Sequence, residues 1–299
     1  MKIAGVVVTY NRKKLLVENI EALLKQTLKD VLTIIIIDNN STDGTRDALQ
    51  IYRENEKIVY VNTGKNLGGA GGFHYGIRYA AEHDFDYIWV MDDDCIPTLT
   101  SLEALLKASE KLGGQYGFLA SKVLWKNREL CKMNIQRTSL WNTVHDWKTP
   151  LVPIIFSSFV SLFVPTQIVR EYGLPIKEFF IWTDDWEFTR RISRKLPCYL
   201  VNDSVVIHKS KKNFGANIVN DELERLDRYD YLYRNDVYLY RREGWEGLLY
   251  EVLRLIVHTI KVLAHARGKK YSRLKKIYSA TYKGLYFHPC IEFPERKKI

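Results

Sequence analysis

The feature that most constrains the fold of this chain is an alternation, over its first hundred residues, of short β-branched runs and stretches with helical spacing. Strands are predicted at residues 3–8, 32–37, 58–62 and 87–91, and helices at residues 13–26, 43–55 and 72–82. This order predicts an α/β fold with a mostly parallel sheet flanked by helices. In such sheets ligands bind at the carboxyl ends of the strands, so the residues that follow each strand are the first candidates for function.

The rest of the chain is less regular and then becomes helical. Strand-like runs at residues 118–124, 154–164 and 198–207 are interrupted by prolines, and we expect them to add mixed strands to the same sheet. From about residue 221 the spacing is helical, and residues 245–266 predict a long second helix of this region. We therefore divide the 299 residues into an α/β domain at 1–215 and a basic, helical C-terminal region at 216–299.

The composition limits the class of protein further. The net charge is +10, and no acidic residue lies between positions 252 and 291, which predicts an anionic partner such as lipid headgroups, nucleic acid or a phosphorylated substrate. The four cysteines include no CxxC pair, which argues against a structural zinc site and favours free thiols in a reducing cytosol. The apolar runs are too short for a spanning helix or a signal peptide, and neither is expected.

Three consecutive aspartates, Asp92, Asp93 and Asp94, follow the fourth predicted strand. Carboxylates clustered at the end of a buried strand repel one another, and a divalent cation relieves that repulsion. Oxygen ligands suit Mg²⁺ or Mn²⁺, and such a cation commonly bridges a diphosphate. An acidic loop that faces water is the simpler explanation of a lone triplet, so the interpretation depends on the other motifs.

A glycine-rich run precedes the third predicted helix, with four glycines in residues 68–72. Glycines allow the backbone to approach a ligand, and a helix that starts there offers its amino end to a phosphate or a sugar. The run has neither the Gly-Lys-Ser/Thr of a Walker loop nor a GxGxxG pattern. A tight turn with close helix packing explains it about equally well.

A second acidic cluster contains Asp184 and Asp185, with Trp182 and Trp186 beside them. Aromatic faces stack on the C–H surfaces of sugars, while a carboxylate can take a proton from a hydroxyl group. A helix with acids in its first turn is the structural alternative. His208 follows the strand predicted at 198–207, and a histidine at that position is either structural or a metal ligand.

Together these motifs resemble family 2 glycosyltransferases with the GT-A fold. The resemblance extends from residue 3 to about residue 240, and its segments are V-V-V-T-Y-N-R at 6–12, I-I-D-N-N-S-T-D-G-T at 36–45, N-L-G-G-A-G-G at 66–72, D-D-D at 92–94, D-D-W-E-F-T-R-R at 184–191 and Y-L-Y-R-N at 231–235. Within the family the chain is most similar to galactofuranosyl- and rhamnosyltransferases of bacterial envelope polysaccharides. The resemblance implies an inverting, metal-dependent transfer of a sugar, with UDP-galactofuranose as the expected donor and dTDP-rhamnose as the alternative. The implied acceptor is a hydroxyl group of a cell-envelope glycan or a lipid-linked acceptor.

The resemblance also implies a role for each site residue. Asp92 and Asp94 correspond to the DxD pair of the family and, with His208, are expected to bind Mn²⁺ or Mg²⁺. Asp185 stands where the family has its catalytic base. Burial between the two tryptophans is expected to raise its pKa, so that the carboxylate becomes a stronger base. Substrate binding is expected from Thr9, Arg12, Asp38, Asn66, Gly68, Asp93, Trp182, Asp184, Trp186 and Arg191. The sequence departs from many relatives at Asp184, where they have Glu, and at Asn39, where they have Asp.

Two other classes of protein remain as alternatives. A nucleotidyltransferase would use the same metal and diphosphate, but the basic glycine-rich loop of that class is missing near the first strand. A nucleic-acid-binding protein would use the basic C-terminal region, which has no recognisable reading motif, so no nucleic-acid partner is expected. We instead expect a cytoplasmic protein bound peripherally to an anionic membrane surface on the inner face of the cytoplasmic membrane. Packing of the first C-terminal helix on the α/β domain is the competing explanation, and the oligomeric state stays open.

Overall fold

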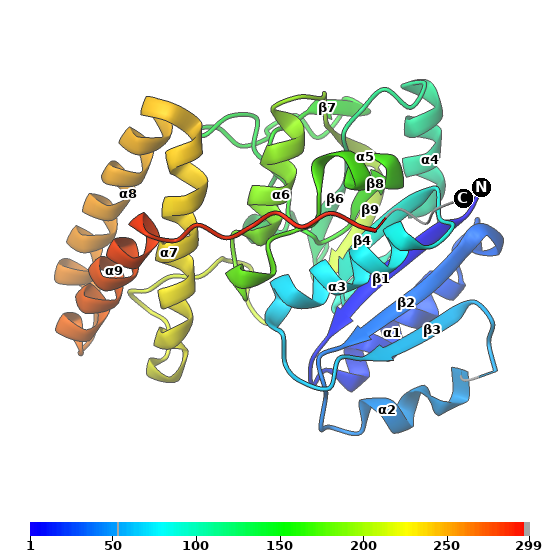
Figure 1. Ribbon diagram of the computed structural model, residues 1–299, viewed down its shortest axis with the longest axis horizontal. Coiled ribbons are helices and arrows are strands. Elements are labelled where there is room, and N and C mark those ends of the chain that lie inside the picture. The colour runs from blue at the N-terminus through cyan, green and yellow to red at the C-terminus, as the bar shows by residue number, and fades with distance from the viewer. Residues whose placement is uncertain (53, 296–299) are drawn as a thin grey trace.

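The computed structural model describes residues 1–52 and 54–295, and its centre is one mixed sheet (Figure 1). Its parallel half has the order β3-β2-β1-β4, and the strands are β1 (Ile3–Thr9), β2 (Leu32–Asp38), β3 (Ile58–Asn62) and β4 (Tyr87–Asp92). The β2 run Leu-Thr-Ile-Ile-Ile-Ile-Asp is almost entirely buried, as expected for a strand covered on both faces. The register pairs Thr9 with Asp38 and Val8 with Asp92, so these strands end at one edge.

The other half of the sheet has mixed strand directions. It contains β5 (Cys95–Pro97), β6 (Leu119–Trp125), β7 (Leu151–Pro153), β8 (Leu162–Pro165) and β9 (Tyr199–His208). β8 joins the two halves by pairing antiparallel with both β4 and β6, and β9 runs parallel to β6. The short β5 pairs antiparallel with β9, opposing Cys95 to His208. This pairing brings the residue that follows the aspartate triplet beside the end of the last strand.

Helices cover both faces of the sheet and build a separate core on each. The helices of this α/β part are α1 (Lys13–Leu24), α2 (Thr45–Ala48), α3 (Gly68–Glu82), α4 (Ser101–Lys111), α5 (Thr166–Tyr172) and α6 (Asp184–Ser193). α3, α5 and α6 pack on one face against residues such as Val6 and Ile35. α1 and α4 pack on the other face against residues such as Val7 and Ile36. Neighbouring residues of one strand thus belong to different cores, as the alternation of side chains in a strand requires.

Three long helices form the C-terminal region and stand together at one end of the molecule (Figure 1). They are α7 (Tyr229–Tyr240), α8 (Gly244–His265) and α9 (Lys270–Leu285), and they share a third core that includes Tyr229, Tyr233 and Ile277. After α9 the chain returns along the α/β domain, where Glu292 forms ion pairs with Arg78 and Lys177. Within the described ranges, none of the helices combines the length and apolar character that crossing a bilayer requires.

The structure corrects three predicted elements. The strand expected at 154–164 is strand only at β8, because the stretch before it turns several times, with Ser161 in the left-handed region at φ 66°. The helix expected at 43–55 is limited to α2 and a 3₁₀ turn that ends at Tyr52, and residue 53 lies outside the described ranges. The helix expected from residue 72 begins earlier, at Gly68, so the glycine-rich run is itself helical.

Candidate active site

A cleft of about 830 Å³ opens at the carboxyl edge of β1 and β4, and the C-terminal helices form its opposite wall. Most residues that the sequence nominated lie on its surface: Thr9, Arg12, Asn66, Gly68, Asp92, Asp93, Asp94, Trp182, Asp184, Asp185, Trp186 and His208. The structure therefore brings both acidic clusters, separated by about ninety residues, into one cavity. Asp38 and Arg191 are the two nominated residues that do not line it.

Asp92, Asp94 and His208 form a group in which one ligand atom from each residue lies within 4.8 Å of the others. Nε2 of His208 is 3.0 Å from Oδ1 of Asp94, and Nδ1 of His208 is 2.8 Å from Oδ1 of Asn134. Burial of Asp92, with the nearby charge of Asp94, raises its pKa to about 6. Burial would lower the pKa of His208, but its hydrogen bonds with Asp94 and Cys131 and the negative charges of Asp94 and Asp92 together outweigh this and raise it to about 10.

These three side chains fit a divalent cation. Two carboxylates and an imidazole are ligands that Mn²⁺ accepts, and Asn134 holds the second ring nitrogen in the way that outer partners orient a metal-binding histidine. The buried Oδ1 of Asp94 faces Nε2 of His208 and has no other hydrogen-bond partner within the described chain, so one of its lone pairs can bind a ligand.

The middle aspartate of the triplet has a different environment. The hydroxyl of Thr9 donates a hydrogen bond of 2.7 Å to Oδ2 of Asp93. Arg12 forms an ion pair with Asp94 and lies 3.5 Å from Asp93. Burial nevertheless raises the pKa of Asp93 to about 7. Arg12 is half-exposed on the cleft surface, so its guanidinium can also meet an anionic group that enters the cleft.

Asp38 and Asn39 lie at the end of β2, where both are buried and form hydrogen bonds within the protein, and Asn39 also lines the cleft. Asp38 is fully buried and accepts hydrogen bonds from the Tyr60 hydroxyl at 2.7 Å and from the Ser41 amide at 2.8 Å. Asn39, the position where relatives differ, donates to the carbonyl of Gly68 at 2.9 Å. The end of β2 therefore supports the start of α3, and the role predicted for Asp38 in nucleotide binding remains a prediction.

The glycine-rich run is required by close packing. Gly68 has φ 72°, and a Cβ placed on it would lie 2.1 Å from the carbonyl oxygen of Phe180. A Cβ on Gly72 would lie 2.5 Å from Val8. These contacts account for Gly68 and Gly72 through the packing of α3, whereas a Cβ on Gly69 would meet nothing within 4 Å. Gly68 and Asn66 also line the cleft, which leaves their predicted contact with a ligand open.

The second acidic cluster occupies the first turn of α6. Burial raises the pKa of Asp184 to about 7. Burial also raises the pKa of Asp185 well above its ordinary value, and the neighbouring charge of Asp184 adds to the shift. Oδ1 of Asp185 accepts a hydrogen bond of 2.8 Å from the amide of Trp186. A partly buried carboxylate with a raised pKa on a cleft wall, such as Asp185, has the properties of a general base.

The two tryptophans beside these aspartates are partly covered by other side chains. Trp182 packs on Tyr229, with ring centres 5.3 Å apart. Trp186 packs on Phe156 at the same distance, and the guanidinium of Arg137 lies 4.7 Å from the centre of its ring. Both tryptophans line the cleft, so part of each ring can meet a ligand.

Arg191 points away from the cleft. Its guanidinium donates to the carbonyl oxygens of Tyr172 at 2.6 Å and Leu174 at 2.9 Å, and it pairs with Glu187 at 2.9 Å. These contacts tie α6 to the turn that follows α5. The structure therefore gives Arg191 a supporting position for α6, and its predicted contact with substrate stays a prediction.

The wall of the cleft that the C-terminal region contributes was not predicted from the sequence. This wall presents Asp236, Tyr240, Tyr250, Arg254 and His258, and Arg137 of the α/β domain also lines the cleft. Arg254 is paired with Asp236 at 2.9 Å and with Glu251 at 2.8 Å, and all three side chains are largely buried. The visible signal was Glu251 and Arg254 three residues apart on a mostly apolar helix. A cleft built from both predicted regions makes the C-terminal helices part of the site.

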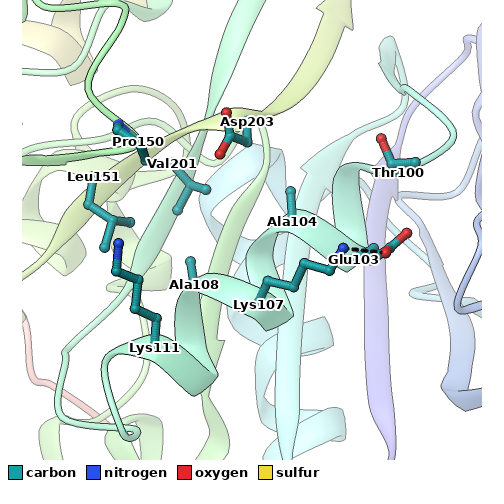
Figure 2. Close-up of a pocket in the computed structure, with 10 residues that line it drawn as sticks. All are labelled: Thr100, Glu103, Ala104, Lys107, Ala108, Lys111, Pro150, Leu151, Val201 and Asp203. Carbon is teal, nitrogen blue, oxygen red and sulfur yellow. Dashed lines mark ion pairs between the residues drawn. The ribbon is translucent and has the colours of Figure 1, made fainter.

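A second hollow of about 480 Å³ lies between α4 and the edge formed by β7 and β9 (Figure 2). Its most conspicuous interaction is the ion pair of Lys107 and Glu103 within α4, at 2.6 Å. None of the predicted site residues, all of which lie within the described ranges, lines this hollow. The chemistry is thus concentrated in the larger cleft.

Comparison with known proteins shows which proteins the chain is similar to. Residues 6–137 match the model of glycosyl transferase family 2. The chain is a glycosyltransferase, and over this stretch it is similar to family 2. This glycosyltransferase is 25% identical over 265 residues to galactofuranosyltransferase GlfT1 of Mycolicibacterium smegmatis, an alignment that covers 83% of this chain and 85% of the relative.

Solved structures show that the fold is GT-A-like. The structure of S. aureus TarS 1-349 in complex with UDP has a TM-score of 0.55 at 15% identity, covering 96% of this chain and 72% of that one. The structure of GalNAc-T7 with UDP, GalNAc and Mn2+ has a TM-score of 0.64 at 13% identity, covering 96% of this chain and 56% of that one. At these identities the likeness concerns the fold alone.

Proposed function

We propose that this glycosyltransferase transfers galactofuranose from UDP-galactofuranose to a hydroxyl group of a cell-envelope glycan, with inversion and with the help of Mn²⁺ or Mg²⁺. The observation that carries the proposal is the single cleft that contains a metal-ligand group on one wall and a partly buried carboxylate, Asp185, on another. The likeness to a relative named as a galactofuranosyltransferase supports the choice of sugar. Neighbours of the same fold that were solved with UDP or with UDP and Mn2+ support the donor class and the cation.

The proposed reaction needs a base and a neutralised leaving group. Asp185 takes the proton of the acceptor hydroxyl while that oxygen forms a bond to the anomeric carbon of the sugar. The bond from that carbon to the diphosphate breaks, and UDP leaves with the electron pair. A cation bound by Asp92, Asp94 and His208 supplies charge neutralisation for the diphosphate. An inverting transfer is a single displacement, so it requires no covalent nucleophile.

The remaining nominated residues take positions around this reaction. Thr9, Arg12, Asn66, Gly68 and Asp93 are proposed to contact the nucleotide and diphosphate, on the wall formed by β1, α3 and the aspartate triplet. Trp182, Asp184 and Trp186 are proposed to contact the sugar and the acceptor beside Asp185. Asp38 and Arg191 are proposed to act indirectly, because Asp38 holds Tyr60 and Ser41 at the end of β2 and Arg191 supports α6.

We also propose that the acceptor is lipid-linked and that the enzyme works on an anionic membrane surface at the cytoplasmic face. The outer face of α8, as we call it, is an uninterrupted set of exposed apolar side chains at helical spacing: Trp245, Leu248, Leu249, Val252, Leu253, Ile256, Val257, Ile260 and Leu263. The opposite face of the same helix lines the cleft through Tyr250, Arg254 and His258. A helix between the bilayer surface and the cleft suits an acceptor whose lipid stays in the membrane.

A donor panel tests the proposed activity. The purified chain is incubated with UDP-galactofuranose, UDP-galactopyranose, UDP-GlcNAc or dTDP-rhamnose, in Mn²⁺ or in excess EDTA, and the release of UDP or dTDP is measured. We expect UDP-galactofuranose to be consumed fastest, and only with the metal. Preference for dTDP-rhamnose would replace the proposed donor. Pyrophosphate-dependent exchange with a sugar 1-phosphate would instead indicate a nucleotidyltransferase.

A further inference from the structure

The two aspartates of α6 are presented by a short loop, residues 178–183, whose backbone is unusual. Three of its non-glycine residues have left-handed φ angles: Phe180 at 62°, Trp182 at 66° and Thr183 at 69°. Side chains with a Cβ disfavour this region, and a β-branched residue such as threonine does so most strongly. A loop with this backbone persists only where its surroundings hold it.

The surroundings that hold loop 178–183 come largely from α7. The side-chain amide of Asn235 donates to three carbonyl oxygens of the loop, those of Phe179 at 3.0 Å, Ile181 at 3.3 Å and Trp182 at 3.0 Å. Oδ1 of the same amide accepts hydrogen bonds from Arg234, which fixes the direction of the amide. Asn235 is fully buried, so no water can take over these contacts.

The next residue of α7 completes the contact. Oδ1 of Asp236 accepts a hydrogen bond of 2.7 Å from the hydroxyl of Thr183, the residue immediately before the aspartates. Its other oxygen lies 2.9 Å from Arg254 of α8. Thr183 is therefore connected through Asp236 to the wall of the cleft that α8 contributes.

Aromatic side chains and α3 hold the same loop. Phe180 stacks on Tyr231 with ring centres 4.9 Å apart, and Trp182 packs on Tyr229. On the opposite side the amide of Ala70 donates to the carbonyl oxygen of Phe180 at 3.1 Å. Residues 229–236 thus contact the loop at each position from 179 to 183. This segment includes the Y-L-Y-R-N motif at 231–235.

We infer that Asn235 and Asp236 are positioning residues for the transfer reaction, which set Asp184 and Asp185 in place by fixing loop 178–183. Neither Asn235 nor its three carbonyl partners need touch a substrate. This role explains why a motif of the C-terminal region accompanies the motifs of the α/β domain. It rests on the proposed function, because it acts through the aspartates.

The test is a double-mutant cycle of Asn235→Ala and Asp185→Asn, measured as kcat per folded molecule and as affinity for UDP with Mn²⁺. Asp230→Asn, on the same helix but paired with Lys276, is the matched control. We expect Asn235→Ala to lower kcat about 10–100-fold, since small displacements of a reacting group have effects of this size. UDP affinity should stay within about twofold, and the loss should disappear in the Asp185→Asn background because both changes affect one step.

The kcat values of the variants show whether Asn235 positions the aspartates. A normal kcat for folded Asn235→Ala, or a full loss added to that of Asp185→Asn, would overturn the positioning role. A normal kcat for Asp185→Asn alone would instead contradict the proposed base, and the two failures are distinct because they occur in different single variants. If Asn235→Ala does not fold, two variants of Thr183 test the same network: Thr183→Val removes the hydroxyl that Asp236 accepts from, and Thr183→Ser keeps it. A loss of kcat in the valine variant but not in the serine variant supports the role. Equal losses in both variants oppose it.

Discussion

At the scale of single residues, the two acidic clusters of the cleft differ in what surrounds them. Asp94 faces a histidine and an arginine, which favour its charged form, and its pKa is lowered despite burial. Asp185 faces another carboxylate, and burial raises its pKa well above the ordinary range. A charged carboxylate suits a metal ligand, whereas one that binds a proton readily suits a base.

The first prediction concerns Asp94. Asp94→Ala removes a ligand from the metal group, so UDP affinity in the presence of Mn²⁺ should fall to the level measured in EDTA. Affinity without metal should change little. Isothermal titration calorimetry measures both, and Asp203→Ala, an exposed aspartate of β9, is the matched control. Metal-enhanced UDP binding that survives in Asp94→Ala would exclude this residue as a ligand.

A second prediction concerns the outer partner of His208. Asn134→Ala removes the group that holds Nδ1 of His208, and metal affinity should fall about 10–100-fold. His208→Ala should lose at least as much. Mn²⁺ titration of the folded variants, followed by electron paramagnetic resonance of the free ion, gives the affinities. Equal Mn²⁺ affinity in wild type and both variants would make His208 a structural residue.

Single residues also show where sequence reasoning ended. Asp92, Asp94, Asp184 and Asp185 could be nominated because each cluster is contiguous in sequence and adjoins a strand or a helix start. Asn235 and Arg254 could not, because their roles arise only when α7 and α8 pack against loop 178–183 and the cleft. Arg191 was nominated from a motif, but tertiary contacts direct its guanidinium to backbone carbonyls.

At the scale of elements, α8 has two faces with different surroundings. Its inner face carries the buried pair of Glu251 and Arg254, and its outer face is apolar and exposed. The sequence predicted this helix within one residue at each end, because its spacing is regular. It could not tell whether the apolar stripe packs on the α/β domain. In the structure the stripe faces outward, which leaves the membrane explanation open to test.

The prediction at this scale is that the protein binds anionic vesicles through α8 and the basic residues that follow it. Lysines near the surface contribute about 1 kcal/mol each on anionic lipid, so Lys261, Lys269 and Lys275 changed to Glu should abolish binding. Lys276 is omitted because it pairs with Asp227 and Asp230. The same number of changes at Lys111, Lys126 and Lys148 is the control. Co-sedimentation measures binding, and Ile256→Glu should weaken it through the apolar face.

Two results would speak against the membrane. Equal binding to neutral and anionic vesicles would remove the role of the lysines. A stable dimer in solution that Ile256→Glu dissociates would show that the outer face of α8 meets a second copy of the chain. Analytical ultracentrifugation of wild type and Ile256→Glu separates these cases.

At the scale of the whole molecule, the acidic cleft makes folding stability depend on pH. Burial raises the pKa of Asp184 to about 7, so between about pH 4 and pH 7 the folded chain binds a proton that the unfolded chain has released. This contribution to stability is fully present below about pH 4 and is lost as the pH rises through 7.

The expected result is that the free energy of unfolding of metal-free protein contains a component that falls between about pH 4 and pH 7, and that Asp184→Asn removes it. Urea denaturation at several pH values measures the slope. Asp203→Asn, at an exposed position, should leave the slope as in wild type. Identical slopes for wild type and Asp184→Asn would show that burial of this carboxyl does not shift its protonation.

The measurement that tests the central claim most directly is the turnover of UDP-galactofuranose with Mn²⁺ by Asp185→Asn, compared with wild type and Asp184→Asn. The amide keeps the shape of the carboxylate and removes its basicity, so kcat should fall by about three orders of magnitude while donor affinity stays near that of wild type. Wild-type turnover by Asp185→Asn would contradict the account. Loss of turnover in Asp184→Asn alone would move the base by one residue.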